Sequence, residues 1–170
     1  MRTRPSLLLA AFVLAASSVS AQSRDPYFAT ATAAYDFIYH ELGETSALGS
    51  HFDIASTIKR DVPFLSLAGE VGISHFDGAN VLSFLGGPRL RLPNASDNIL
   101  PFVQFFAGLY HCGACDISDF AIQGGGGVDF RARRASDIRI RGQVDWRHMF
   151  DDFGDFNAWR LAAGVVFPLN

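Results

Sequence analysis

Two cysteines, Cys112 and Cys115, carry the most reactive side chains in this sequence, and only Gly and Ala separate them. In a protein exported to an oxidising compartment, such a pair forms a disulfide. A redox-active Cys-x-x-Cys motif belongs at a helix N-terminus in a thioredoxin-like βαβ pattern, which the surrounding sequence lacks. His111 and Asp116 flank the pair and add two possible metal ligands. We predict a disulfide between Cys112 and Cys115 and no cofactor, with a metal site as the alternative.

Charged side chains occur at every second position in several stretches, and ion pairing is the chemistry that this spacing favours. In the most regular stretch, Arg139, Arg141 and Asp145 alternate with Ile138 and Ile140. A period of two is that of a β-strand, so the charges share one face and the apolar residues the other. Thirteen of the 14 basic residues are Arg, the cation suited to buried bidentate ion pairs.

The same alternation recurs along the chain in eight stretches, at about residues 29–40, 51–59, 64–75, 81–92, 99–111, 120–131, 137–150 and 157–169. Strands of roughly 9–14 residues suit a membrane-spanning barrel, whereas the strands of soluble sandwiches usually have about 5–6. No helical period or linker marks a second domain. We therefore predict an all-β fold, an eight-stranded antiparallel up-and-down transmembrane β-barrel.

The first residues have the features of a secretory signal peptide. Two arginines precede an apolar run at 7–16, and small residues follow it up to Ala21. An apolar run of about ten residues is too short for a spanning helix, which needs roughly 20. We predict a signal peptide over residues 1–21, which is cleaved, and a single barrel domain over residues 22–170.

The charge balance argues against nucleic acid as a partner. Cleavage removes two of the 14 basic residues and none of the 17 acidic ones, so the mature chain is acidic. A nucleic-acid-binding domain usually carries a clustered basic patch. We predict no nucleic-acid partner.

Aromatic residues favour lipid on the apolar face of the strands. They gather near the predicted strand ends, as interfacial girdles of a membrane barrel require. We predict one girdle of Tyr39, Phe120, Phe150 and Trp159, and another of Tyr27, Phe102, Phe130 and Phe167. The alternative is a soluble periplasmic β-barrel that buries the apolar face and binds an apolar ligand.

The opposite face would line the lumen, where charges must pair. We predict a lumen network of Asp36, Glu70, Arg89, Arg91, Asp129, Arg139, Arg141, Asp145 and Arg160, with Asp53, Lys59 and Arg147 on the same face. Hairpin register predicts that Asp129 lies across from Arg139 and that Glu70 lies diagonal to Arg89. Because eight strands leave an interior that side chains fill, we predict a plugged barrel that conducts poorly.

The connecting segments fall into two sets. With the N-terminus in the periplasm, we predict extracellular loops at 41–50, 76–80, 112–119 and 151–156, and periplasmic turns at 60–63, 93–98 and 132–136. The run Gly124 to Gly127 is not a phosphate loop, because no Lys-Ser or Lys-Thr and no helix follows it. Glycine inside a strand more often marks a bend or a close backbone approach.

Several motifs resemble the bacterial outer-membrane β-barrel domain proteins. They are Ser83-Phe-Leu-Gly-Gly-Pro-Arg89, Pro101-Phe102, Gly124-Gly-Gly-Gly-Val-Asp129, Gln143-Val-Asp145 and Arg160-Leu-Ala-Ala-Gly-Val-Val-Phe167. This group is similar in architecture to the small OmpA and OmpX type of barrel. The resemblance implies a Gram-negative cell-envelope protein in the outer membrane. The final segment, Gly164 to Leu169, also resembles the signal read by the outer-membrane assembly machinery, although Leu169 stands where an aromatic residue is usual.

The resemblance leaves an enzymatic alternative open. A lipid A deacylase with this architecture uses Ser, His and a carboxylate on the outer face of its barrel, and His148 lies on the apolar face near the outer rim. No Ser stands convincingly beside it, so we predict no catalytic residues and read His148 as an interfacial side chain. We predict a non-enzymatic barrel with a structural or surface-interaction role, whose partners are lipid and the assembly machinery.

Overall fold

The computed structural model describes residues 27–40, 43–59, 62–76, 79–92, 98–113, 117–133, 136–150 and 156–169. The predicted signal peptide, residues 1–21, lies outside the described residues. No helix in the described part of the chain is long and apolar enough to cross a membrane.

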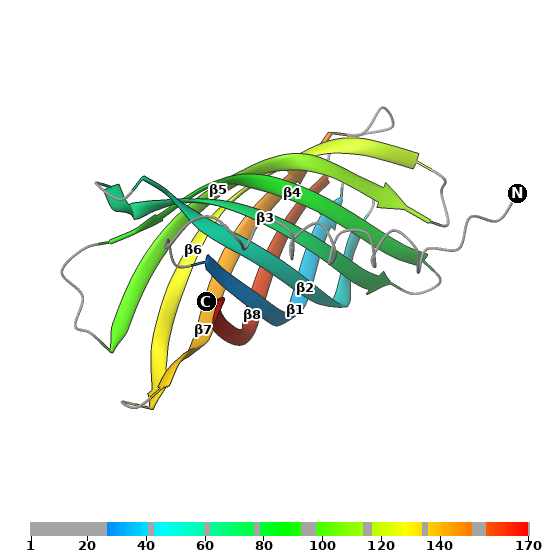
Figure 1. Cartoon of the computed structure of the whole chain (residues 1–170). Helices are drawn as coiled ribbons and strands as arrows, with labels where there is room; N and C mark the ends of the chain where they lie inside the picture. The colour runs from blue at the N-terminus through cyan, green and yellow to red at the C-terminus, as the bar shows by residue number, and fades with distance from the viewer. Residues whose placement is uncertain are drawn as a thin grey trace, which may run out of the picture.

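The described residues form eight long strands that close into one barrel (Figure 1). Each strand pairs antiparallel with the next along the chain, and β8 pairs with β1 to complete the ring. The predicted eight-stranded antiparallel barrel is therefore confirmed. The strands are β1 (Tyr27–His40), β2 (Gly43–Lys59), β3 (Val62–Phe76), β4 (Ala79–Arg91), β5 (Ile99–Cys112), β6 (Ile117–Arg133), β7 (Ser136–Met149) and β8 (Phe156–Leu169).

The pairing register makes the barrel narrow and tilted. Followed strand by strand from Ala29, the register returns to β1 at Tyr39, which is ten residues further along. Such a stagger tilts the strands by about 35–45° and gives an interior that side chains can fill. We call the end where β1 begins and β8 ends the terminal end, and the other the loop end.

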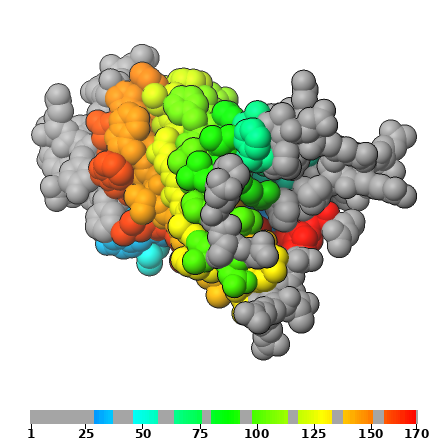
Figure 2. Space-filling model, turned by 90° about the vertical axis from the view of Figure 1, so that its left-hand side faces the viewer, coloured from blue at the N-terminus to red at the C-terminus, as the bar shows by residue number. Residues whose placement is uncertain are grey.

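Side chains alternate between the two faces of the barrel wall as the sequence predicts. Leu67 and Ile140 face outward and are 59% and 52% exposed, whereas Ser66 and Arg141 beside them are buried. Figure 2 shows part of the outer surface, over β5 to β8 in green to orange. The exposed large side chains on the whole outer face include Phe84, Val103, Phe105, Leu109, Val144, Trp159 and Leu161. An apolar exterior around a charged interior is the arrangement of a membrane barrel.

One predicted girdle residue is in the wrong place. Phe102 is 2% exposed and faces inward, with Gln104 and Phe106 on the same side of β5. The alternation of β5 requires this, because Val103 and Phe105 face outward. The other girdle side chains that the structure describes are exposed, namely Phe120, Phe130, Phe150, Trp159 and Phe167.

The expected loop at 41–50 is also wrong, because β2 begins at Gly43. Its first residues are small or polar and lack the apolar alternation of the other strands. Backbone pairing with β1, from His40–Gly43 onward, holds this part of β2 in the sheet. Outward-facing polar residues are compatible with a strand that continues beyond the membrane.

We expect spin labels to distinguish the two faces in lipid. A label at Leu67, Val103 or Ile140 should be accessible to oxygen dissolved in the bilayer, because these side chains are exposed on the apolar exterior. Labels at Ser66, Gln104 and Gln143, the buried inward neighbours, serve as controls. Power-saturation EPR with oxygen and a water-soluble nickel complex measures the difference. Equal responses from the two sets would contradict a lipid-facing exterior.

Candidate functional site

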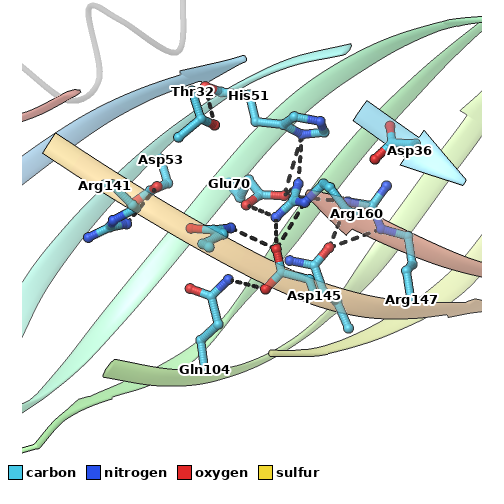
Figure 3. Close-up of polar contacts among 12 residues, drawn as sticks. Thr32, Asp36, His51, Asp53, Glu70, Gln104, Arg141, Asp145, Arg147 and Arg160 are labelled. Carbon is cyan, nitrogen blue, oxygen red and sulfur yellow. Dashed lines mark hydrogen bonds and ion pairs between the residues drawn. The ribbon is translucent and has the colours of Figure 1, made fainter. Parts of the chain in front are cut away.

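A guanidinium group crosses the middle of the lumen and holds two carboxylates (Figure 3). Arg160 of β8 donates to both oxygens of Glu70, at 2.6 and 2.9 Å. It also donates from Nη2 and Nε to Asp145 Oδ2, at 2.7 and 3.0 Å. All three side chains are buried. A guanidinium matched to two carboxylates is the geometry in which a buried charge is well compensated.

A second ion-pair group lies nearer the terminal end. Arg141 binds Asp129 bidentately, with Nε–Oδ1 and Nη2–Oδ2 distances of 2.7 and 2.9 Å. Arg89 donates from Nη1 to Asp53 Oδ1 at 2.7 Å, and Arg141 Nη1 lies 3.4 Å from Asp53 Oδ2. Asp53 therefore joins the two arginines into one cluster.

Two inward phenylalanines form an apolar surface beneath these arginines. The guanidinium of Arg141 lies 4.4 Å from the ring centre of Phe102, and that of Arg89 lies 5.2 Å from the same ring. Arg89 also lies 5.6 Å from the ring centre of Phe106. Cation–π attraction is strongest for cations removed from water, so these rings add to the stability of the cluster. The sequence interpretation missed them, although their alternation with Gln104 was the available signal.

Glutamine side chains connect the two groups. Gln104 accepts from Arg89 Nε at 2.9 Å and donates to Asp145 Oδ1 at 2.9 Å. Gln143 donates to Asp145 Oδ2 at 2.7 Å. The two ion-pair groups are therefore one hydrogen-bonded network through the lumen.

The network continues toward the loop end through Arg147. This side chain donates to Gln123 Oε1 at 2.7 and 3.0 Å and lies 3.4 Å from Glu70. His51 Nδ1 lies 2.9 Å from Arg160, and Asp36 accepts from Ser74. A cavity of about 20 Å³ beside Asp36, Ser74, Arg147 and Arg160 has room for about one water molecule.

The predicted network residues lie on the inward face, but the predicted partners are wrong. Asp129 faces and binds Arg141, whereas Arg139 lies across from Arg131. Two features of the hairpin cause the difference: Arg133 and Ser136, which belong to the predicted turn, already pair, and the register shifts between Arg131 and Arg133. For Glu70 the predicted diagonal neighbour Arg89 binds Asp53 instead, and Glu70 binds Arg160.

The glycine run of β6 leaves room for the network. Gly125 pairs directly with Asp145, and a Cβ on Gly125 would overlap the Asp145 carboxylate. A Cβ on Gly127 would likewise meet the backbone of Gly142 and Gln143. These contacts agree with the close backbone approach expected of glycine within a strand.

Among the described residues of the loop end, a side-chain contact on the outer face or rim joins the two strands of each hairpin. The hydroxyl group of Tyr35 donates to Ser46 Oγ at 2.9 Å in the β1–β2 hairpin. In the next three hairpins the pairs are His75–Asn80 at 2.6 Å, His111–Ser118 at 2.8 Å and His148–Asn157 at 3.0 Å. The ring of His148 also lies against Trp146 and Phe150, at 5.7 and 4.5 Å between ring centres. Amphipathic rings of this kind suit a membrane interface.

The cysteine pair lies only partly within the described residues. Cys112 ends β5 and is disulfide-bonded, while Cys115 and Asp116 lie outside the described residues. In the part of the chain that the structure describes, no group of three or more His, Cys, Asp or Glu could hold a metal ion. The Cys112–Cys115 pairing stays a prediction.

The closed eight-stranded barrel with an apolar exterior and a charged lumen is the fold of the small outer-membrane β-barrels. No protein-family profile and no curated protein sequence matches this chain. Solved structures do resemble it. One is Neisserial surface protein A, NspA, with a TM-score of 0.70 and 12% identity over 83% of this chain and 96% of that chain.

Two further solved barrels are similar. The outer membrane enzyme PagL has a TM-score of 0.58 and 15% identity, over 82% of this chain and 99% of its own. The attachment invasion locus protein Ail of Yersinia pestis, in complex with the heparin analogue sucrose octasulfate, has a TM-score of 0.55 and 12% identity. That likeness covers 85% of this chain and 100% of Ail. These likenesses show a shared fold.

We expect Arg160→Met to destabilise the barrel by about 3–5 kcal/mol, because it leaves Glu70 and Asp145 as buried charges without their main partner. Urea unfolding of the protein in lipid vesicles, followed by tryptophan fluorescence, measures the change. A triple variant that adds Glu70→Gln and Asp145→Asn is the matched control and should recover much of the loss. An unfolding midpoint for Arg160→Met equal to that of the wild type would contradict a buried ion-pair role.

We expect Cys112 and Cys115 to be bonded to each other in the exported protein. Non-reducing peptide mapping by mass spectrometry should recover a peptide in which the two residues are linked. Such a small ring removes little entropy from the unfolded chain, so reduction should leave the barrel folded. Two alkylatable thiols under native, non-reducing conditions would contradict the pairing.

Proposed function

We propose that this protein is a small barrel of the bacterial outer membrane with a structural or surface-interaction role, and that its lumen is plugged. The observation that carries the proposal is the buried network from Asp129 and Arg141 to Glu70 and Arg160, which occupies the interior. Lipid is the partner that fits the exposed apolar exterior. The likeness to NspA and Ail supports a role at the cell surface.

The proposal includes the route to the membrane. Residues 1–21 serve for export as a cleaved signal peptide. The last strand, β8, presents its outward residues Val165, Phe167 and Leu169 to the assembly machinery after export. The terminal end then faces the periplasm and the four hairpins of the loop end face the exterior, the arrangement usual for bacterial barrels.

We propose a non-enzymatic role, although PagL shows that an enzyme can have this fold. The Ser–His contact on the outer rim, His111 with Ser118, is the arrangement that a hydrolase would need. Equivalent positions on the neighbouring hairpins hold His75–Asn80 and His148–Asn157, which offer no nucleophile. Among the described residues, no carboxylate is within hydrogen-bond distance of His111. The repetition favours one shared function for the three pairs, which is packing at the membrane interface.

We expect the purified protein to show no stable, porin-sized conductance steps in planar bilayers. Buried arginines and carboxylates occupy the lumen, and the cavity beside Asp36 and Arg147 has room for about one water molecule. A large porin, recorded under the same salt and voltage, is the control. Stable large conductance steps would refute the plugged barrel and favour a channel function.

A further inference from the structure

Two arginines at the terminal end of the lumen face each other across neighbouring strands. Arg131 of β6 and Arg139 of β7 are direct partners in the register. Both side chains are on the inward face, because Asp129 and Arg141, two residues deeper in the barrel, are buried. Like charges directly opposite each other destabilise a strand pair. This pair therefore has a repulsion that a bound anion would relieve.

Each arginine of this pair has a side-chain N–H group that does not donate to any described residue. Arg131 Nε and Arg139 Nη1 are buried and have no hydrogen-bond partner within the described ranges. The nearest described carboxylate along β6 is Asp129, and Arg141 already binds both of its oxygens. A buried N–H without a partner is costly, so this arrangement is suited to accept a ligand oxygen.

A third arginine adds positive charge at the same end. Arg91, near the end of β4, interacts electrostatically with Arg139 and with Asp129. The guanidinium groups of Arg91, Arg131 and Arg139 thus lie at this end of the lumen together with Asp129, whose carboxylate Arg141 binds. Guanidinium groups bind phosphate and carboxylate oxygens in a bidentate manner, so an oxyanion is the ligand that fits.

The charges of the whole chain favour entry of an anion from this end. The sequence around the four hairpins of the loop end, residues 41–50, 76–80, 112–119 and 151–156, contains eight Asp or Glu residues and no Lys or Arg. The predicted turns of the terminal end, 60–63, 93–98 and 132–136, instead contain three Arg and two Asp residues, and Lys59 precedes the first of them. A charge asymmetry of this kind repels anions at one end and attracts them to the other.

We propose that Arg131 and Arg139, with Arg91 adding charge, form a binding site for an oxyanion of the phosphate class that enters from the terminal end. This site goes beyond the proposed structural role, because it adds a ligand-binding site at the periplasmic end of the barrel. The phosphate group belongs either to a soluble molecule or to a lipid headgroup at the rim. Both present the same oxygens to the guanidinium groups.

Isothermal titration of inorganic phosphate into the whole protein in a maltoside detergent tests the site. We expect saturable binding of phosphate by the wild type. Arg131→Gln or Arg139→Gln should lower the affinity at least about tenfold. Arg131→Lys should have an intermediate affinity, because lysine keeps the positive charge but lacks the bidentate geometry of the guanidinium group. Arg134→Gln is the matched control, since it removes a positive charge from the neighbouring turn sequence, and it should bind as the wild type does. Equal affinities in all four variants, or no binding by the wild type, would overturn the proposal.

Thermal unfolding gives a second readout that separates ligand binding from a purely structural role. Phosphate should raise the melting temperature of the wild type and leave that of Arg139→Gln unchanged. Without phosphate, Arg139→Gln should melt no lower than the wild type, because it removes a repulsion. A lower melting temperature of Arg139→Gln without phosphate would mean that the arginine is held by protein partners, and would overturn the site.

Nanodiscs distinguish the two sources of phosphate. In phosphatidylcholine discs, added inorganic phosphate is expected to bind as it does in detergent. In discs that contain phosphatidylglycerol, the lipid headgroup should compete with the added phosphate if it is the ligand. Competition that disappears in Arg131→Gln assigns the site to lipid. Equal binding in both kinds of disc assigns it to a soluble oxyanion.

Discussion

The width of the lumen is the constraint on which the rest of the structure depends. Eight strands with a stagger of ten residues enclose a space that side chains fill, so little water remains to solvate a charge. Each buried carboxylate therefore needs a cation held by the protein. Arg160 meets this need for Glu70 and Asp145, and Arg141 meets it for Asp129. Glu70 of β3 and Arg160 of β8 come from strands that are not neighbours, so their contact also ties the walls of the barrel together.

The alternation of residue types was enough to predict the strands and their faces, because the period of two follows from backbone geometry alone. It placed Ile140 outside and Arg141 inside, as the structure has them. It could not predict that Arg160 binds Glu70, 90 positions earlier in the chain. That contact depends on the stagger accumulated over eight strands. In the β6–β7 hairpin, Arg133 already pairs with Ser136 and the register then shifts by one more residue, so Asp129 faces Arg141 and not Arg139.

Two other differences follow from judging residues by type instead of position. Phe102 is apolar and was assigned to the exterior, but alternation places it inside, where a ring face beside Arg141 is favourable. The polar residues at the start of β2 predict a loop, but pairing with β1 makes this segment a strand. In both cases the position of the residue in the strand, and not its side-chain type, determines where the residue lies.

The side-chain contacts at the loop-end rim lie within single hairpins. The side-chain pairs Tyr35–Ser46, His75–Asn80, His111–Ser118 and His148–Asn157 each join the two strands of one hairpin. The ion pairs of Arg160 and Arg141 involve none of these residues. Segments beyond the rim pairs can therefore change in length and sequence at little cost to the wall beneath them. In evolutionary terms, the barrel wall would stay constant while the four loop-end segments vary.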